Sequence, residues 1–99
     1  MSESRALPPA AVIVTNEVAD WATWKTHFDA HEGARKAAGM LGHHINRDRE
    51  RPNVVSVYLA LSDLAKARAF AGSADLHRVM KDAGVLDAPK VVWMRPTPG

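Results

Sequence analysis

His31 and Arg35 are the two side chains of this sequence best suited to chemistry on a small molecule. They lie four residues apart, about one helical turn, and share a helix face with Trp24 and Phe28. A buried arginine needs a carboxylate, carbonyls, water or an anionic ligand, and histidine suits proton transfer near neutral pH. The pattern predicts a cleft between this helix and a sheet, with His31 as the titratable group and Arg35 as the oxyanion or carboxylate anchor.

The same spacing also fits a structural role for the pair. If the apolar stripe leaves the core late in the helix, Arg35 extends its charged head to water and His31 hydrogen-bonds a carbonyl. The protein is then a non-catalytic ligand-binding or structural dimer. A cleft that both side chains reach favours an enzyme, and a closed cleft favours the structural role.

Further side chains that could line such a cleft are aromatic rings and histidines. Rings on the same helix would exclude water around a bound aromatic molecule. Adjacent histidines on a strand point to opposite faces of the sheet, so one of His43 and His44 can face the helix. The candidate substrate-binding residues are Trp21, Trp24, Phe28, Tyr58, His43 and His44.

The five histidines leave a metal or heme site open as an alternative. His27 precedes His31 by four residues, a spacing that can chelate a metal from one helix, and His43 or His44 could add a third ligand. His77 lies at the border of the apolar stripe of a later helix, where it could form a pocket lip or an axial heme ligand. The simpler interpretation of His27 and His77 is a solvent-exposed position.

Two helical regions are expected to position these residues. The first spans residues 21–38, with Asp20 as N-cap and Gly39 as its stop. The second is interrupted at Gly72 and comes in two segments. Ser62 is the expected cap of residues 63–71, Ser73 caps residues 74–83, and Gly84 ends that segment.

Four runs rich in β-branched residues predict strands at residues 10–15, 40–47, 54–61 and 90–95. The order is β-α-β-β-α-β, the ferredoxin-like motif of the α+β class, with a four-stranded antiparallel sheet and helices on one face. The other face would be left bare, although both faces of residues 54–61 are largely apolar. A homodimer that packs sheet against sheet, a dimeric α+β barrel, would cover it.

Length and composition restrict the classes of function. The 99 residues predict one domain over residues 10–95, with a flexible arm at 1–9 and a tail at 96–99. The absence of cysteine excludes disulfides and thiolate sites, and we expect a cytoplasmic protein without a signal peptide or membrane span. The net charge of +2 is scattered and alternates in sign near residues 47–51, which argues against a nucleic-acid partner.

Several short motifs run through residues 18–92. They are DWATWK at 20–25, FDAH at 28–31, RKAAG at 35–39, NRD at 46–48, PNVV at 52–55, DLAKA at 63–67 and AGV at 83–85. Together they resemble the antibiotic biosynthesis monooxygenase-like proteins of the dimeric α+β-barrel superfamily. The resemblance implies a ligand cleft between helices and sheet within each subunit, the cleft that His31 and Arg35 are predicted to face.

That superfamily includes cofactor-free quinone-forming monooxygenases, heme-degrading monooxygenases and polyketide cyclases. The resemblance places Asn16 near the end of the first strand and offers Trp21, Trp24 and Tyr58 as site aromatics, whereas a heme-degrading activity would use His77 as axial ligand. Our first hypothesis is therefore a small-molecule enzyme that acts without a cofactor on an aromatic or polyketide-like substrate, by oxygenation or cyclisation. The alternatives are the non-catalytic dimer and a histidine-based metal or heme site.

Overall fold

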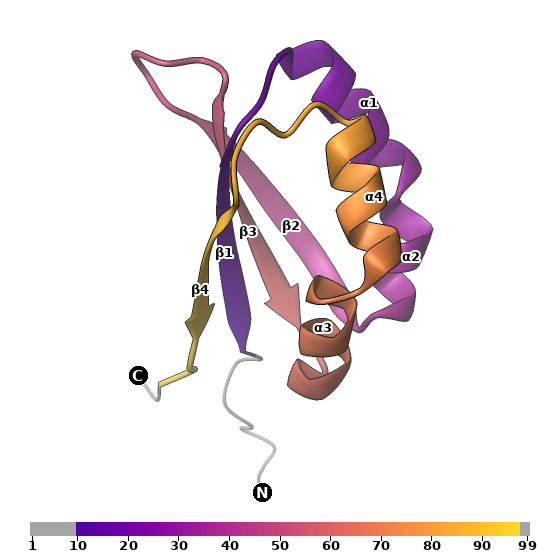
Figure 1. Cartoon of the computed structure of the whole chain (residues 1–99). Helices are drawn as coiled ribbons and strands as arrows, with labels where there is room; N and C mark the ends of the chain where they lie inside the picture. Colours follow the sequence, from indigo (N-terminus) through magenta and orange to yellow (C-terminus); the bar gives the residue numbers. More distant parts are fainter. Residues whose placement is uncertain (1–9, 98–99) are drawn as a thin grey trace, which may run out of the picture.

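Four strands pair antiparallel in the computed structural model, which describes residues 10–97. They are β1 (Ala11–Glu17), β2 (Met40–Arg47), β3 (Val54–Leu61) and β4 (Lys90–Met94), and they lie in the order β2-β3-β1-β4 (Figure 1). The predicted arm at residues 1–9 and residues 98–99 of the predicted tail lie outside the described residues.

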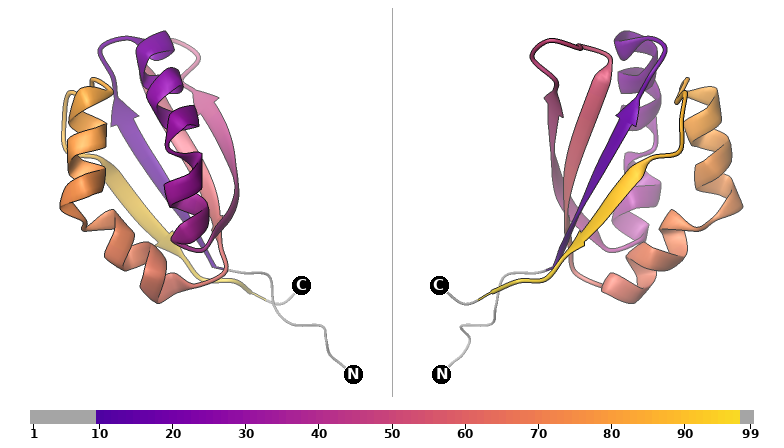
Figure 2. Two further views of the ribbon diagram at one scale, coloured as in Figure 1. Left: turned by 90° about the vertical axis from the view of Figure 1, so that its right-hand side faces the viewer. Right: turned by 60° about the vertical axis from the view of Figure 1, so that its left-hand side comes forward.

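Two helical connections cover one face of this sheet. The first consists of α1 (Trp21–Ala30) and α2 (Glu32–Ala37), and the second of α3 (Leu64–Ala71) and α4 (Ala74–Asp82). Both lie on the same side of the strands (Figure 2). The predicted α+β, ferredoxin-like fold is thereby confirmed. In the described part of the chain, no helix is long and apolar enough to cross a bilayer.

The core lies between the helices and the covered face of the sheet. Val12 of β1 and Val55 and Leu61 of β3 are almost completely buried, and Trp24 packs on them from α1. The second helical connection contributes less: α4 has one strongly apolar side, yet none of its nine residues is fully buried. α4 therefore does not pack closely against the sheet.

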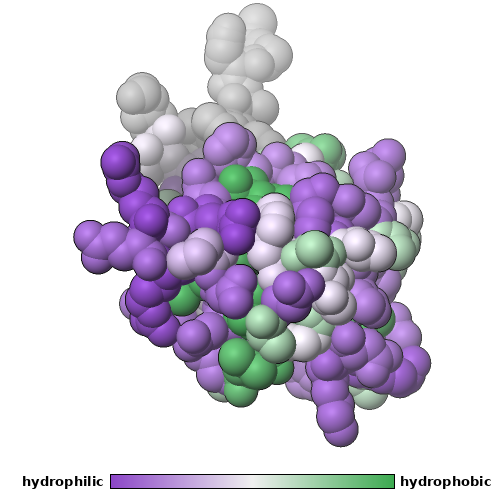
Figure 3. All heavy atoms as spheres, turned by 90° about the horizontal axis from the view of Figure 1, so that it is seen from above, coloured by the Kyte–Doolittle hydropathy of each residue, from purple (hydrophilic) through white to green (hydrophobic). Residues whose placement is uncertain are grey.

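The opposite face of the sheet has no helix on it in the described residues. One row of side chains crosses it from strand to strand, in the paired order His44, Tyr58, Ile13 and Val92. Tyr58 and Val92 are each 43% exposed. Seen from above, by contrast, the end of the molecule is mostly hydrophilic with small apolar patches (Figure 3). The bare sheet face is thus an apolar surface built from alternate residues of its strands.

The first helix is not continuous, contrary to the prediction for residues 21–38. It breaks at His31, which ends α1 and precedes α2 with φ −94° and ψ 11°. The Phe28 carbonyl, which a regular helix would bond to the N–H four residues later, accepts from the His31 N–H at 3.2 Å and from Arg35 Nη1 at 2.6 Å. The Arg35 side chain therefore bonds a backbone carbonyl in the turn where the helix breaks.

Helix caps follow the sequence with one correction. Asp20 caps α1 by accepting from the Thr23 N–H at 2.9 Å, a bond that lowers the pKa of the Asp20 carboxyl, and Ser73 caps α4. The cap of α3, however, is Asp63 and not Ser62, because the Asp63 carboxylate accepts from the Lys66 N–H at 3.0 Å. The Ser62 hydroxyl instead donates to the carbonyl of Gly39.

Gly39 is expected to resist substitution. Its φ is +83°, and an added Cβ would lie 3.2 Å from Asp63 Cβ and from Ser62 Oγ. Gly39→Ala should therefore lower the free energy of unfolding by roughly 1–3 kcal/mol, the range for a non-glycine residue held in this region.

Gly33 is the matched control for Gly39. It lies within α2, where an added Cβ meets nothing within 4 Å. Gly33→Ala should raise stability by up to about 1 kcal/mol, because alanine is the better helix former. Urea unfolding at a fixed protein concentration measures both values, and an equal effect of the two substitutions would contradict the assignment of strain to Gly39.

Candidate functional site

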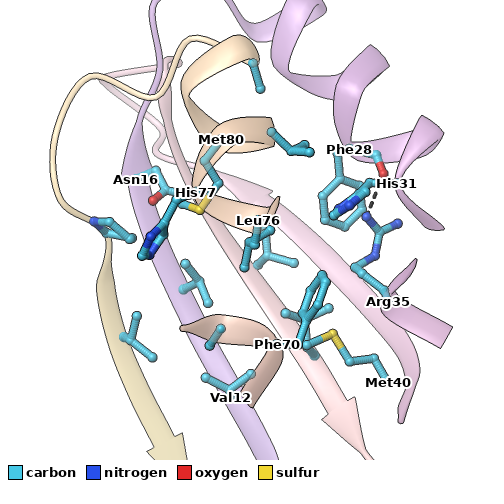
Figure 4. A pocket seen from close by; sticks show the side chains of 18 of the residues that line it. Val12, Asn16, Phe28, His31, Arg35, Met40, Phe70, Leu76, His77 and Met80 are labelled. Carbon is cyan, nitrogen blue, oxygen red and sulfur yellow. Dashed lines mark hydrogen bonds between the residues drawn. The ribbon is translucent and has the colours of Figure 1, made fainter. Parts of the chain in front are cut away.

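A cavity of about 140 Å³ lies between the helices and the covered face of the sheet (Figure 4). Its walls come from β1, β3 and β4 below and from α1 to α4 above. Most of the lining is apolar, for example Val14, Leu76 and Met80. This cavity occupies the space between α4 and the sheet, which explains why α4 buries no residue fully.

Asn16 is the polar group that the sheet contributes to this cavity. Strand β1 runs two residues beyond the predicted end at Thr15, because Asn16 pairs with Val55 and Glu17 with Val54. Alternation along the strand then turns Asn16 to the same face as Val12 and Val14. Asn16 is 4% exposed, and its Oδ1 atom has no hydrogen-bond partner.

Arg35 brings a buried positive charge to the same cavity. The residue is 7% exposed, its Nη1 donates to the Phe28 carbonyl, and its guanidinium carbon lies 3.5 Å from the centre of the Phe28 ring. Burial lowers the pKa of the Arg35 guanidinium, and the negative charges of Glu32 and Asp29 act in the opposite direction. Within residues 10–97, no carboxylate forms an ion pair with it.

His31 lies at the break between α1 and α2, with its ring in the cavity wall. Its Nε2 atom is 3.6 Å from an oxygen of Asp75, at the start of α4, and its ring centre is 5.6 Å from that of Phe70. The side chain is 16% exposed. The predicted pair of His31 and Arg35 therefore does come together in one cavity.

The aromatic residues of α1 form a stack that ends in this cavity. Ring centres lie 5.6 Å apart between Trp21 and Trp24, and 5.0 Å apart between Trp24 and Phe28. The lining includes Trp24 and Phe28. Trp21 is absent from it and carries the Arg47 guanidinium 4.3 Å above its ring centre. Trp21 therefore lies outside the cavity and stacks on Trp24.

The adjacent histidines of β2 divide between the two sheet faces. His43 pairs with buried Leu59, faces the helices, and meets the Phe28 ring edge-on at 4.9 Å between ring centres. Its own contact is with a small side groove, while the lining of the main cavity does not include it. His44 and Tyr58 lie on the bare face and do not reach the cavity, although the sequence had made both of them candidate substrate-binding residues.

The two remaining histidines lie at the cavity edge. His27 Nδ1 is 2.9 Å from the Thr23 carbonyl oxygen, and His77 is exposed on α4. Both side chains line the cavity along with His31. In the part of the chain that the structure describes, no three His, Cys, Asp or Glu side chains are grouped so that they could hold a metal ion.

Sequence reasoning missed several lining residues. Phe70 of α3 packs beside His31, and Met40, Trp93 and Pro89 complete the wall near the strands. Phe70 is the one aromatic residue of α3, which was an available signal. Asn16 entered through the resemblance alone, because its position at a strand end concealed its burial.

At the level of sequence, no family model and no curated protein matches the chain. Solved structures do match it. A Bordetella bronchiseptica protein provisionally named an antibiotic biosynthesis monooxygenase aligns at a TM-score of 0.75 and 16% identity, covering 92% of this chain and 99% of that one. The chain has the antibiotic biosynthesis monooxygenase fold.

Two further structures with this fold carry informative descriptions. SnoaB of Streptomyces nogalater, a cofactor-independent oxygenase, aligns at a TM-score of 0.69 and 15% identity over 93% of this chain and 96% of its own. The monooxygenase ActVA-Orf6 of Streptomyces coelicolor, in complex with nanaomycin D, aligns at 0.64 and 20% identity over 93% and 90%. These similarities establish the fold of the present chain.

Proposed function

We propose that the protein is a small-molecule enzyme of the monooxygenase-like group that acts without a cofactor on an aromatic or polyketide-like substrate. The observation that carries this proposal is the buried Asn16 oxygen without a partner, set in a mostly apolar cavity that Arg35 and three histidines also line. An unsatisfied buried acceptor costs free energy, and a ligand with a hydroxyl or N–H group would satisfy it. The described relatives, a cofactor-independent oxygenase and a nanaomycin complex, support the same class of reaction.

The cavity suits one or two aromatic rings. Its volume of about 140 Å³ is close to that of an engineered apolar cavity that binds benzene. Trp24 and Phe28 would pack against the ring and keep water from the reacting carbon. Pockets of this composition, with a few polar groups in an apolar wall, are typical ligand sites.

His31 and Arg35 supply the two charged functions of the proposed reaction. A phenol oxygen of the substrate binds Arg35, and His31 accepts the proton as a carbanion forms at a ring methylene. Dioxygen then bonds to that carbon, and His31 returns the proton to the peroxide. Loss of water leaves a carbonyl, so that CH₂ and O₂ become C=O and H₂O. In a cyclisation the same carbanion would instead attack a carbonyl carbon of its own molecule.

A homodimer is part of this proposal. The bare sheet face carries Ile13, Tyr58, Val92 and Met94, and a second copy would cover it while leaving both cavities on the outer, helical side. Burial of apolar area at about 25 cal/mol per Å² favours such pairing. We know of no element within residues 10–97 that covers this face instead.

A turnover assay tests the proposed chemistry. Anthrone-type phenols and polyketide-like β-diketones are offered to the purified protein under air, and oxygen uptake and product formation are followed. His31→Ala and Arg35→Ala should each lower kcat/KM by about 100-fold or more, because each removes a group that acts on the reacting atoms. Lys81→Gln, which removes an exposed lysine of α4 that does not line the cavity, should leave it unchanged. Undiminished turnover in both alanine variants would exclude these roles.

Non-catalytic ligand binding is the second candidate, and one observation favours it. His31 already approaches Asp75, and Arg35 already donates to a carbonyl, so both polar groups have internal contacts. Under this candidate, aromatic ligands bind the cavity but no compound is turned over. Tight binding without turnover across the whole screen would select it over the enzyme.

A further inference from the structure

The Arg35 guanidinium has no ion-pair partner within residues 10–97, although the charges of Glu32 and Asp29 act on it from a longer range. The guanidinium is buried against the Phe28 ring and one carbonyl, and neither contact neutralises it. Its neighbour Lys36 is different, since it is exposed and 3.6 Å from Glu32. Burying a cation without an ion-pair partner is costly, and Glu32 and Asp29 offset only part of that cost. An anionic ligand group in direct contact would offset more of it.

A small side groove lies next to the same guanidinium. It has a volume of about 30 Å³ and is lined by Arg35, Lys36 and His43 together with Gly42, which follows the register shift in β2. Arg35, Met40 and Leu59 belong to both the groove and the main cavity. Arg35 therefore lines both the main cavity and the side groove. A compact anionic group at the end of a ligand would meet three basic side chains in the groove. Glu32 is the carboxylate in the same lining.

The Asn16 end has the opposite requirement. Its Oδ1 atom is an acceptor without a donor, and Asn16 lies beside His77 of α4 in the cavity (Figure 4). A carboxylate or a quinone oxygen could accept only from the Asn16 NH2 group and would leave Oδ1 unpaired, whereas a hydroxyl or an N–H group can donate to Oδ1. This end of the cavity thus selects for a hydrogen-bond donor.

The two requirements are separated along the cavity. Leu59, which lines the Arg35 wall, is paired with Val12, and Asn16 lies four residues further along β1, about 13 Å at 3.3 Å per residue. Figure 4 places Asn16 beside His77 at one side of the pocket and Arg35 at the other, with Leu76 and Met80 between them. An apolar stretch therefore divides the cation from the acceptor.

We infer that the ligand of this cavity is an elongated aromatic anion that carries its charge at one end and a hydroxyl or N–H donor at the other. The carboxylate or phenolate binds Arg35, the flat apolar middle packs between α4 and the sheet, and the donor bonds Asn16 Oδ1. This inference deepens the proposed function, because it rests on the cavity being the substrate site. It does not depend on which reaction follows.

Binding of a short ligand series tests this inference. The probes are 6-hydroxy-2-naphthoate, 2-naphthoate, which lacks the donor, and 2-naphthol, which lacks the carboxylate, each alongside its one-ring counterpart 4-hydroxybenzoate, benzoate or phenol. Titration calorimetry measures Kd for each. We expect the hydroxy acid of at least one ring size to bind tightest, with a loss of about 10- to 100-fold without the carboxylate and about 10-fold without the hydroxyl.

Variants assign each loss to its residue. At pH 7, where free 2-naphthol is neutral, Arg35→Met should weaken the two acids much more than 2-naphthol, and Arg35→Lys should restore part of the loss. Asn16→Leu should weaken the hydroxylated probes and leave 2-naphthoate unaffected. Lys81→Gln removes an exposed lysine of α4 that lines neither space and so controls for the loss of a positive charge. Thr15→Val controls for a polar-to-apolar change on the opposite face of β1, where Thr15 bonds Ser56. Neither control should change any Kd. Circular dichroism checks that each variant is folded.

The outcomes separate this inference from the proposed function. Equal affinity for 2-naphthol and the two acids would overturn the anionic end while leaving an aromatic site intact, and the same applies to the donor if Asn16→Leu has no effect. Binding of no probe of either ring size would overturn the inference, but turnover of another substrate would still support the proposed function. The expected pattern of affinities without any turnover would support the ligand class and count against the reaction.

Discussion

Alanine in place of Trp24 is expected to lower the free energy of unfolding by about 3–5 kcal/mol, the usual loss for a buried tryptophan. Trp24 is 5% exposed and packs with Val12 and Val55 in the core. It also stands in the middle of the aromatic stack, between Trp21 and Phe28. Its removal would join a new void to the existing cavity and deprive Phe28 of the ring that supports it.

Trp21→Ala is the matched control for this experiment. Trp21 has the same side chain and helix but is partly exposed at the end of the stack, so we expect a loss of about 1–2 kcal/mol. Urea unfolding followed by circular dichroism measures both variants at one protein concentration, because dimer formation would couple stability to concentration. A loss below about 1 kcal/mol for Trp24→Ala, or equal losses for the two variants, would contradict the proposed order of burial.

The second large effect concerns assembly. At micromolar concentration, sedimentation should give about twice the mass of one chain, and Val92→Glu should give the mass of a single folded chain. Val92 lies on the bare sheet face, in a row with Ile13 and Tyr58. A twofold axis would bury the new carboxylate twice without a partner, and each such charge costs about 3–5 kcal/mol.

Leu86→Glu provides the control for the assembly experiment. Leu86 is 62% exposed, more than Val92, but it lies in the connection between α4 and β4 and not on the sheet face. Its substitution should leave the mass of the dimer unchanged. A folded wild-type monomer would overturn the proposed interface, and dissociation by both substitutions would show that added charge, rather than its place on the sheet, breaks the dimer.

Much of the fold could be predicted because its signals are local. Runs of β-branched and apolar residues such as 54–61 predict strands. Asp20 and Ser73 mark helix starts because their side chains accept from N–H groups three residues later. The break at His31 could not be predicted in this way. It coincides with a hydrogen bond from the Arg35 side chain to a carbonyl seven residues earlier, a contact that exists only in the folded chain.

The candidate site was predictable where one element determined it. Helical periodicity placed Trp24, Phe28, His31 and Arg35 on one face, and the structure brings all four to the cavity. The sheet residues were different, because their orientation depends on register. His43 and His44 could not be distinguished until β2 was paired with β3, and Asn16 was hidden because β1 runs further than its β-branched stretch.

The position of α4 above the cavity links ligand binding to the stability of the fold. The apolar side of α4 is not fully buried because the cavity lies beneath it, and this cavity is the proposed ligand site. A bound aromatic molecule would complete the packing that the chain leaves incomplete, so affinity and folding would draw on the same contacts. Evolution of this site toward a different ligand would then also adjust how firmly the helix is held, and changes of specificity would be accompanied by changes in thermal tolerance.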